Sequence, residues 1–586
     1  MRYKIILIMS VFFLLIPFFS QAEVIDNRDS RQEYARSVSQ LGVLEKSTDS
    51  SDSRFKKGRQ SSMTLVLFRT LEGTPDLHEY EPDILVLGPH GCFTAAYEDE
   101  DSAMAAIEYL LSLPDIIYAE LDGEVYADDV MTDSNSDEQE EIELWDSFHS
   151  HGAFEMGFGE VVPWCGNVGT GSVSVAVIDS GTYPHPFLEA RLETSGFDYV
   201  DGDEDATNDV YGHGTHVAGI IVDCTPELPV YIRPIRVLNA SGKGSIANTT
   251  SAIFEAAEAG CGVINLSLTT NKHSEALEDA VRFALDCESL VVASAGNNGD
   301  DTKGYCPVHM DDPGLIVVGA CAGSYNAPVL TSYSNYGASV DVFAFGTSIK
   351  SCSLTGGYET RTGTSQAAPH ISALCAIMRL LFPSVGCGQI ESRVKKLAGE
   401  GEINIPNASL LVPQTMGIGA QDIYLPVGTA IKLLETALPE TSFVTISWHC
   451  EDDSIAVVNE SGILTCMEEG TTVLSGDSSV NESVSVNLHV IADGSVFNIP
   501  SAVTTIEAEA FVGTAVKVIY LPASLQSLEK NAFCNSNLKT IFYSGGNMLL
   551  EDLQDVDRNL CIVTDRQKNL WRRLKNAGLN YLVSCG

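Results

Sequence analysis

The spacing of hydrophobic residues divides the chain into segments with different expected folds. Residues 63–127 contain two strand-like runs, Met63–Arg69 and Ile84–Leu87, and a helical pattern over Ser102–Leu113, which together predict a small α/β unit. Residues 144–409 alternate apolar β-rich runs with helical stretches, which predicts parallel strands joined by crossover helices. The expected strands are Val173–Ile178, Val230–Val237, Val263–Leu268, Leu290–Ala293 and Leu315–Ala320.

Helical periodicity disappears towards the end of the chain. Residues 421–492 contain short apolar runs separated by turn residues, which predicts an all-β sandwich. Within residues 494–586, Ile499–Val503 recurs as Leu521–Leu525, 22 residues later. A fixed period of that kind is typical of solenoids, and two copies need a cap or a neighbouring domain to cover their open faces.

Residues 1–22 have the pattern of a secretory signal peptide. Arg2 and Lys4 precede an apolar run from Ile5 to Phe19, and Ser20-Gln21-Ala22 supplies small residues for cleavage. An uncleaved anchor is the alternative, but the run is shorter than the roughly 20 apolar residues that a span needs. We expect a secreted protein, extracellular or associated with the cell surface, without a membrane span in its mature form. Polar residues 23–62 and an acidic stretch at 128–143, interpreted as a solvated linker, flank the first α/β unit.

The formal net charge of -45 changes the range of expected partners. Such a chain is repelled by phosphates and anionic lipid surfaces, so we expect no nucleic-acid partner. The 15 cysteines are odd in number and irregularly spaced, with no CxxC pair. Their pairing therefore stays open, and burial as small apolar residues is an alternative to disulfides.

Three motifs of the segment 144–409 carry candidate chemistry. Asp179 ends the expected strand Val173–Ile178 and is followed by Ser180-Gly181, so it lies where parallel sheets place their sites. A capping aspartate at a strand end is the alternative. His213 stands between Gly212 and Gly214 at the start of a small-residue helix, and imidazole exchanges protons near neutral pH.

A second histidine, His216, follows three residues after His213. Two histidines at this spacing are a zinc alternative, but no HExxH pattern accompanies them, so we interpret His216 as a packing residue. The third motif is Thr362–His370, in which Ser365 lies at the start of an apolar helix. Pro369 is tolerated there because it falls in the first turn. A helix N-terminus favours negative charge developing beside a nucleophile, and an ordinary serine cap is the alternative.

In the order Asp, His, Ser, these motifs resemble those of the subtilisin-like serine peptidases, the subtilases, over residues 144–409. The resemblance implies a subtilisin-like parallel sheet flanked by helices. It also implies that Asp179 orients His213, that His213 takes the proton of Ser365, and that Ser365 attacks the peptide carbonyl. The segment Ser294–Gly299 resembles the oxyanion segment of the family, which assigns Asn297 as the side-chain donor.

The resemblance extends to the substrate cleft. Leu266, Ser267 and Leu268 lie in a segment similar to the strand that pairs with the substrate backbone. Thr269 replaces a glycine usual in the family, which could narrow the pocket, and Gln366 replaces a methionine after the nucleophile. Residues 63–127 resemble the inhibitory propeptide of the family, and we expect a cut near Ala127 or within the acidic linker.

Two further modules are expected after the peptidase segment. Residues 421–492 resemble a bacterial immunoglobulin-like domain of group two, and residues 494–586 resemble leucine-rich repeats of bacterial surface proteins, followed by a C-terminal cap. These modules imply attachment or a cell-surface ligand, with plain spacers as the alternative.

The function implied is a secreted serine endopeptidase made as a self-inhibited zymogen. Its partners are protein or peptide substrates and its own propeptide. The alternative is a surface adhesin whose peptidase domain serves self-maturation. No cofactor is required for this chemistry. We interpret Asp201–Asp209 as a solvated loop, with a calcium site as the alternative, and calcium elsewhere stays open but unplaced.

Overall fold

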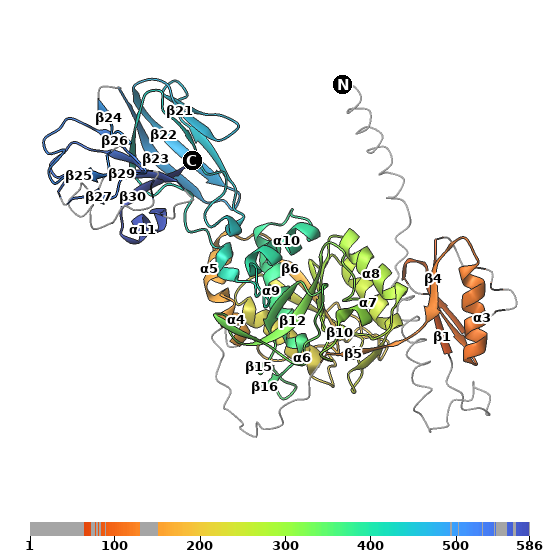
Figure 1. Cartoon of the computed structure of the whole chain (residues 1–586). Coiled ribbons are helices and arrows are strands. Elements are labelled where there is room, and N and C mark those ends of the chain that lie inside the picture. The colour runs from red at the N-terminus through yellow and green to blue at the C-terminus, as the bar shows by residue number, and fades with distance from the viewer. Residues whose placement is uncertain are drawn as a thin grey trace, which may run out of the picture. The chain divides into compact units, whose positions relative to one another are not determined.

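The computed structural model describes residues 64–128 and 151–584, except for gaps at 72–74, 76, 78–79, 81, 83, 88, 493–494, 502, 530, 544, 546–559 and 566–569. The expected signal peptide, the polar segment 23–62 and residues 129–143 of the acidic linker lie outside the described residues. The chain forms two compact units (Figure 1). The first comprises Met1–Val162 with Thr170–Pro406, and the second comprises Pro163–Gly169 with Asn407–Gly586.

The N-terminal part of the first unit is a four-stranded antiparallel sheet with the order β2-β3-β1-β4 and one helix. Its elements are β1 (Thr64–Thr70), β2 (Ile84–Leu87), β3 (Cys92–Tyr97), α3 (Glu100–Leu111) and β4 (Ile116–Leu121). The helix begins at Asp99, whose side chain accepts a hydrogen bond from the Ser102 amide. Its apolar side buries Ala106 and Leu110 against Val66 and Phe68 of the sheet. Residues 64–121 therefore have their own small core.

The main part of the first unit is built on a seven-stranded sheet with the order β13-β12-β11-β9-β6-β7, in which β14 also pairs with β12. All pairings are parallel except that of β12 with β13. The strands are β6 (Val173–Asp179), β7 (Val230–Arg236), β9 (Val263–Leu266), β11 (Leu290–Ser294), β12 (Leu315–Ser324), β13 (Ala327–Leu330) and β14 (Val342–Phe345). The expected strand Val263–Leu268 is divided into β9 and the separate β10 (Leu268–Thr269).

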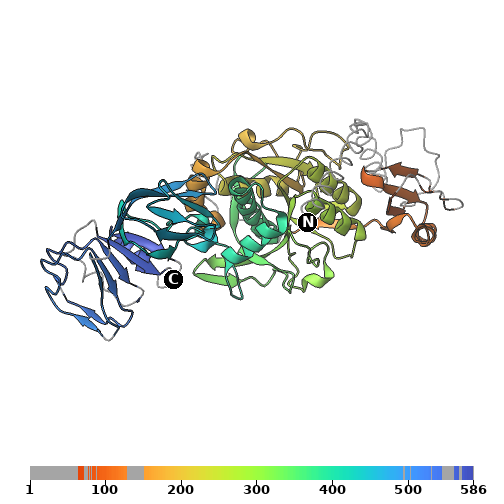
Figure 2. The same ribbon diagram turned by 90° about the horizontal axis from the view of Figure 1, so that it is seen from above.

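Helices cover both faces of this sheet (Figures 1 and 2). They are α6 (His213–Cys224), α7 (Ile246–Glu258), α8 (Glu275–Asp286), α9 (Thr364–Leu381) and α10 (Cys387–Ala398). The yellow-green helices α7 and α8 pack side by side, and their apolar residues share a core with Ala176 and Ile178 of β6. The alternate residues Val175 and Val177 are buried on the opposite face, which α9 covers. Every residue of α9 is buried, and apolar residues such as Ile371, Leu374 and Met378 make up most of its length.

Smaller elements complete the first unit. They are α4 (His151–Glu155) and the antiparallel pair β15 (Ile349–Cys352) and β16 (Tyr358–Arg361). The helix α5 (Phe158–Val168) begins in the first unit, and its residues from Pro163 onwards belong to the second.

A second, three-stranded sheet joins segments far apart in the sequence. Its order is β10-β5-β8, and both pairings are antiparallel. The outer strands, β10 and β8 (Lys243–Ser245), belong to the main part of the unit, whereas the central strand β5 (Glu124–Ala127) follows the N-terminal sheet. The end of the N-terminal part is therefore hydrogen-bonded on both edges.

The second unit contains two kinds of β structure. Residues 422–491 form a four-stranded sheet, β17-β23-β22-β19, and a three-stranded sheet, β18-β21-β20. These strands are β17 (Asp422–Pro426), β18 (Ala430–Lys432), β19 (Ile446–Cys450), β20 (Ala456–Val458), β21 (Ile463–Cys466), β22 (Gly470–Ser478) and β23 (Ser483–Ile491). Trp448 is buried in this unit and donates from its indole N–H to the Leu434 carbonyl at 2.5 Å.

The remainder of the second unit is a parallel ladder, β24-β26-β28-β29-β30. Its strands are β24 (Val496–Asn498), β26 (Val518–Leu521), β28 (Thr540–Tyr543), β29 (Cys561–Asp565) and β30 (Asn580–Ser584), with α11 (Leu570–Asn576) before the last strand. The first pairings align Val496 with Val518 and Val518 with Thr540. The short strands β25 (Thr505–Ile506) and β27 (Ser527–Leu528) pair in the same register. The ladder thus extends beyond the two copies seen in the sequence.

Within the described residues no cysteine forms a disulfide, and most cysteines are buried. Burial raises the pKa of Cys375 and of Cys561 to about 12, so both thiols stay protonated near neutral pH. None of the helices in the described part of the chain combines the length and apolar character that crossing a bilayer demands.

Candidate active site

Asp179 and His213 form a hydrogen-bonded pair at the carboxyl end of the main sheet. Asp179 is the last residue of β6, and His213 is the first residue of α6. The imidazole Nδ1 lies 2.8 Å from Oδ1 and 2.9 Å from Oδ2 of the carboxylate, and both side chains are fully buried. With Nδ1 donating to the carboxylate, Nε2 is the nitrogen that carries the basic lone pair.

The local sequence explains why α6 begins beside β6. Gly212 has a φ of 86°, a conformation that favours glycine, and the Asp209 carboxylate accepts hydrogen bonds from the amides of Gly212 and Thr215 at the helix N-terminus. A Cβ on Gly214 would lie 2.1 Å from the Gly181 carbonyl oxygen. The glycines around His213 therefore let the helix approach the strand closely.

Ser365 is the second residue of α9. Its hydroxyl donates to the Ser267 carbonyl at 3.0 Å, and the Ser267 hydroxyl donates to the Ser365 carbonyl at 3.1 Å. These reciprocal bonds join the end of β9 to the start of α9. Ser365 is fully buried.

Asn297 presents its side-chain amide to a peptide carbonyl. Its Nδ2 donates to the carbonyl oxygen of Asp128, the residue after β5. Its Oδ1 accepts from the amide of Thr364 at 2.9 Å and from the Thr364 hydroxyl at 3.0 Å. Thr364 thereby fixes which way the Asn297 amide faces, with Nδ2 towards the carbonyl.

The chain from β5 to Asp128 lies in the cleft as an extended strand. Leu268 pairs with Ala127 across the β10–β5 edge. The Ala127 amide donates to the Gly242 carbonyl at 3.0 Å, and the Asp128 amide donates to the Ser267 carbonyl at 3.2 Å. Main-chain pairing on both edges is the way in which an extended peptide is held by a sheet-lined cleft.

Asp128 differs from the expectation that it belongs to a solvated linker. It is 7% exposed, and its carboxylate accepts from the Thr269 hydroxyl at 2.7 Å and from the Ser294 hydroxyl at 2.6 Å. Burial raises the pKa of Asp128 to about 6, an effect that the two hydroxyl donors reduce. A single residue at the border of the acidic block is thus a buried part of the site.

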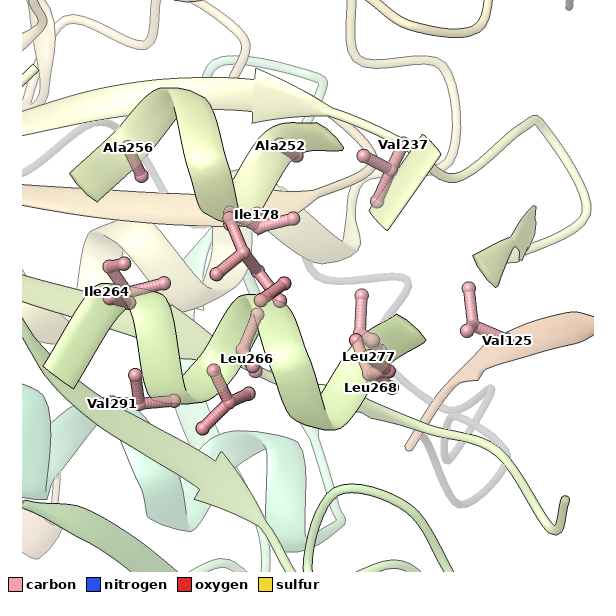
Figure 3. Close-up of a cluster of buried hydrophobic side chains, with 14 of the residues drawn as sticks. Val125, Ile178, Val237, Ala252, Ala256, Ile264, Leu266, Leu268, Leu277 and Val291 are labelled. Carbon is pink, nitrogen blue, oxygen red and sulfur yellow. The ribbon is translucent and has the colours of Figure 1, made fainter. Parts of the chain in front are cut away.

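The remaining residues singled out from the sequence have different surroundings. Leu266 is fully buried and lies in the hydrophobic core near Ile264 and Val291 (Figure 3). His216 Nε2 contacts the Ile349 carbonyl at 3.1 Å, and burial lowers the pKa of this histidine well below its usual value. Gln366 is fully buried in the first turn of α9.

Sequence reasoning did not single out several residues that contact the bound strand. Ser294 begins the segment that contains Asn297, and Thr364 directly precedes Ser365, so their neighbours in the motifs could have pointed to them. Gly242 carried no comparable signal. Its role comes from its carbonyl and depends on the fold alone.

In the acidic loop, carboxylates form bonds within the protein. Arg236 donates to Asp198 and to Asp201, each at 2.6 Å. Elsewhere in the described residues, His273, Glu278 and His309 offer ligand atoms within 4.8 Å of one another, a spacing that could hold a metal ion. Arg282 donates to the same Glu278 at 2.9 Å, which places a positive charge beside that cluster.

Comparison with known proteins identifies two families along the chain. The model described as "Subtilase family" matches residues 170–410. The model described as "BspA type Leucine rich repeat region (6 copies)" matches residues 493–550.

Individual relatives match the first of these segments. A thermophilic serine proteinase of Bacillus sp. (strain AK1) is 38% identical over 255 residues, which cover 41% of this chain and 60% of that protein. Subtilisin Savinase of Lederbergia lenta is 35% identical over 251 residues, which cover 41% of this chain and 90% of that protein. A solved structure of a cold-adapted subtilisin-like serine proteinase aligns at 33% identity with a TM-score of 0.37, covering 40% of this chain and 86% of its own. This chain thus spans less than two thirds of the first relative and most of the second.

Proposed function

Because this chain belongs to the subtilase family, we propose that it is a serine endopeptidase that hydrolyses peptide bonds through Asp179, His213 and Ser365. The observation that carries the proposal is the strand β5, held in the cleft by main-chain bonds, with the carbonyl of the next residue on the amide of Asn297. Such a carbonyl occupies the place of the one that a nucleophile attacks.

The proposed mechanism gives each of these groups one step. Asp179 holds Nδ1 of His213, which leaves Nε2 to take the proton of Ser365. In the structure that hydroxyl donates to Ser267, so the proton has to be redirected towards His213 before attack. Asn297 then stabilises the oxyanion together with the Ser365 amide, and water releases the acyl-enzyme.

The N-terminal part fits the role of an inhibitory propeptide. Its Glu120 accepts hydrogen bonds from the Ser274 hydroxyl and the Glu275 amide at the start of α8, and its Asp122 accepts from the Ala247 amide at the start of α7. These contacts and the pairing of β5 keep substrates out of the cleft. We propose secretion in this inhibited form, guided by residues 1–22.

The second unit supports attachment. Residues 422–491 form two packed sheets, as expected of an immunoglobulin-like domain, and the following ladder matches the BspA type repeat. We propose that these modules keep the peptidase near a cell surface. They also favour a second candidate, an adhesin that uses its peptidase segment only to mature itself.

A serine-reactive fluorophosphonate tests the enzyme proposal. Once the N-terminal part has dissociated from the purified chain, we expect the reagent to label Ser365 and the protein to digest an unfolded protein such as casein. The matched control is Ser365→Ala, which should show neither labelling nor digestion. Labelling of Ser365 together with cleavage of the protein's own chain alone would favour the adhesin. Absence of labelling after the N-terminal part has dissociated would refute catalysis by Ser365.

A further inference from the structure

The pocket that receives the Asp128 side chain has two polar walls. Thr269, the last residue of β10, donates to one carboxylate oxygen, and Ser294, the last residue of β11, donates to the other. Both hydroxyl groups belong to residues with at most 5% exposure. Each oxygen of the carboxylate therefore has a dedicated donor inside a closed pocket.

The backbone of Asp128 identifies which peptide bond this pocket precedes. The Asp128 amide is bonded to the Ser267 carbonyl, and the Asp128 carbonyl is bonded to Asn297. A Cβ on Gly363 would lie 2.6 Å from that carbonyl oxygen and 2.8 Å from Asn297 Nδ2, so the missing side chain leaves room for this contact. The carbonyl in the oxyanion position is thus the one that links Asp128 to Asp129.

We propose that the chain cleaves itself between Asp128 and Asp129, and that Thr269 and Ser294 make aspartate the preferred residue before the bond cut in other substrates. This inference rests on the proposed serine peptidase function. The Asp128 C–N bond breaks as an ester forms with Ser365 Oγ, and the hydroxyl proton passes through His213 to the departing Asp129 amine. Water then hydrolyses the ester and regenerates the Ser365 hydroxyl.

The hydrogen-bonding capacity of the pocket favours a carboxyl group. A carboxylate accepts hydrogen bonds at both oxygens, and two hydroxyl donors match it without any unpaired group. An apolar side chain would leave both buried hydroxyls without this partner, and leaving a buried polar group unsatisfied costs about 1–3 kcal/mol. The Thr269 side chain also takes up space at the wall of the pocket, which disfavours large residues.

A second pocket extends the recognition along the strand. Val125 of β5 is fully buried and lies beside Leu268 and Leu277 (Figure 3). Tyr126 points the other way and is 37% exposed, with Lys243 over its ring. The structure therefore assigns Val-Xaa-Ala-Asp as the sequence pattern recognised at the self-cleavage segment. Xaa corresponds to the exposed Tyr126, and we expect no side-chain preference at this position.

The experiment combines the natural cut with a peptide panel. The full chain is purified, and the N-terminus of its mature form is determined by mass spectrometry. Fluorogenic peptides Val-Tyr-Ala-Xaa, with Xaa as Asp, Asn, Ala or Leu, are then hydrolysed by the mature enzyme. We expect a mature chain that begins at Asp129 and a kcat/KM for Asp at least about 10-fold above that for Leu, because leaving a buried hydroxyl without a partner costs about 1–3 kcal/mol.

Two single variants connect this preference to its cause. Thr269→Gly and Ser294→Ala should each lower the Asp-to-Leu ratio of kcat/KM by roughly 10-fold, since each removes one hydrogen-bond donor to the bound carboxyl group. If a variant does not fold, Asp128→Leu in the otherwise unchanged chain gives the same information from the substrate side. We expect its self-cleavage to be at least about 10-fold slower than that of the native chain.

The outcomes separate this inference from the function on which it rests. Two results, each together with fluorophosphonate labelling, would overturn the inference and leave the peptidase proposal standing. One is a mature N-terminus other than Asp129, and the other is an Asp-to-Leu ratio of kcat/KM that is the same in both variants as in the native protein. Absence of both labelling and hydrolysis would overturn both. A cut after Asp128 with no preference for Asp in peptides would reject the specificity assigned to Thr269 and Ser294.

Discussion

Gly363 offers a direct test of the proposed oxyanion site. It precedes α9, and its φ of 161° is extended backbone that alanine adopts without strain. In Gly363→Ala, the new Cβ would lie 2.6 Å from the Asp128 carbonyl oxygen. Carbon–oxygen contacts are normally about 3.3 Å or longer, so the carbonyl would have to retreat by roughly 0.7 Å from its present position.

The shift of this carbonyl and the shift of Asn297 Nδ2, which the same Cβ meets at 2.8 Å, together disrupt the hydrogen bond between them. Loss of one oxyanion donor typically reduces kcat by about 10²–10³, which corresponds to about 2.7–4 kcal/mol. We therefore expect the self-cleavage rate of Gly363→Ala to fall by that factor. Because the Cβ also lies 2.8 Å from Asn297 Nδ2, the amide itself has to move and cannot follow the carbonyl.

The assay is the time course of self-cleavage, followed by gel electrophoresis of the purified full chain. Gly159→Ala is the matched control, because a Cβ at Gly159 meets nothing within 4 Å and alanine is favoured over glycine in the helix α5. Both variants should show cooperative unfolding by circular dichroism. Self-cleavage of Gly363→Ala within about threefold of the control would refute the assigned carbonyl position.

Three further predictions concern the bound strand. The pKa of Asp128 is raised from 3.8 to about 6 by burial, with His213 and Asp179 as the charged groups that face it, so the site favours the protonated acid. We therefore expect kcat/KM for peptides ending in Asp, divided by kcat/KM for peptides ending in Asn, to be highest below pH 4. This ratio should fall by on the order of 100-fold as the pH rises to 6 and stay constant above pH 6. A ratio that does not change between pH 4 and pH 7 would contradict this prediction. The valine of the fluorogenic peptide corresponds to Val125, and replacing it by alanine should raise KM roughly 10-fold, because each buried methylene-sized group that is lost costs about 0.8 kcal/mol. KM is measured from initial rates, and an unchanged KM would show that this position is not recognised. Glu120→Ala removes two hydrogen bonds at the start of α8 and should shorten the delay between self-cleavage and casein digestion roughly 10-fold, whereas an unaltered delay would mean that this contact does not hold the N-terminal part in place.

The main sheet was predictable because its signals are local. The run from Val173 to Ile178 is long enough and apolar enough to be recognised as a buried strand, and Asp179 follows it directly. The turn glycines beside His213 and the helix after Ser365 are likewise visible over a few residues. From the sequence alone, these features predict candidate side chains at the carboxyl ends of strands and at helix N-termini.

The strand in the cleft could not be predicted in the same way. The strands β5, β8 and β10 each have at most four residues, and their pairing joins distant segments. The Thr269 and Ser294 hydroxyls that hold Asp128 come from 141 and 166 residues away in the sequence. Within an acidic block, no local pattern distinguishes the one carboxylate that is buried from those that are solvated.

The repeat shows a partial success of another kind. Two copies are visible in the sequence because Ile499–Val503 recurs as Leu521–Leu525, and in the structure Val496, Val518 and Thr540 start strands at the same 22-residue interval. The later strands pair in the same ladder, but Cys561 and Asn580 follow at shorter intervals, and α11 lies between β29 and β30. Search by a fixed period misses such units, although their backbones stack in the same way.

The central place of β5 in its small sheet has a consequence for timing. Breaking one peptide bond after Asp128 changes none of the main-chain hydrogen bonds that join β5 to β8 and β10. If the proposed self-cleavage occurs, the cleaved strand therefore stays bound as a product and continues to inhibit the enzyme after this first turnover. The delay before the protein can act on another substrate is then set by the rate at which residues 64–128 dissociate. Cleavage begins this delay, and dissociation of the segment ends it.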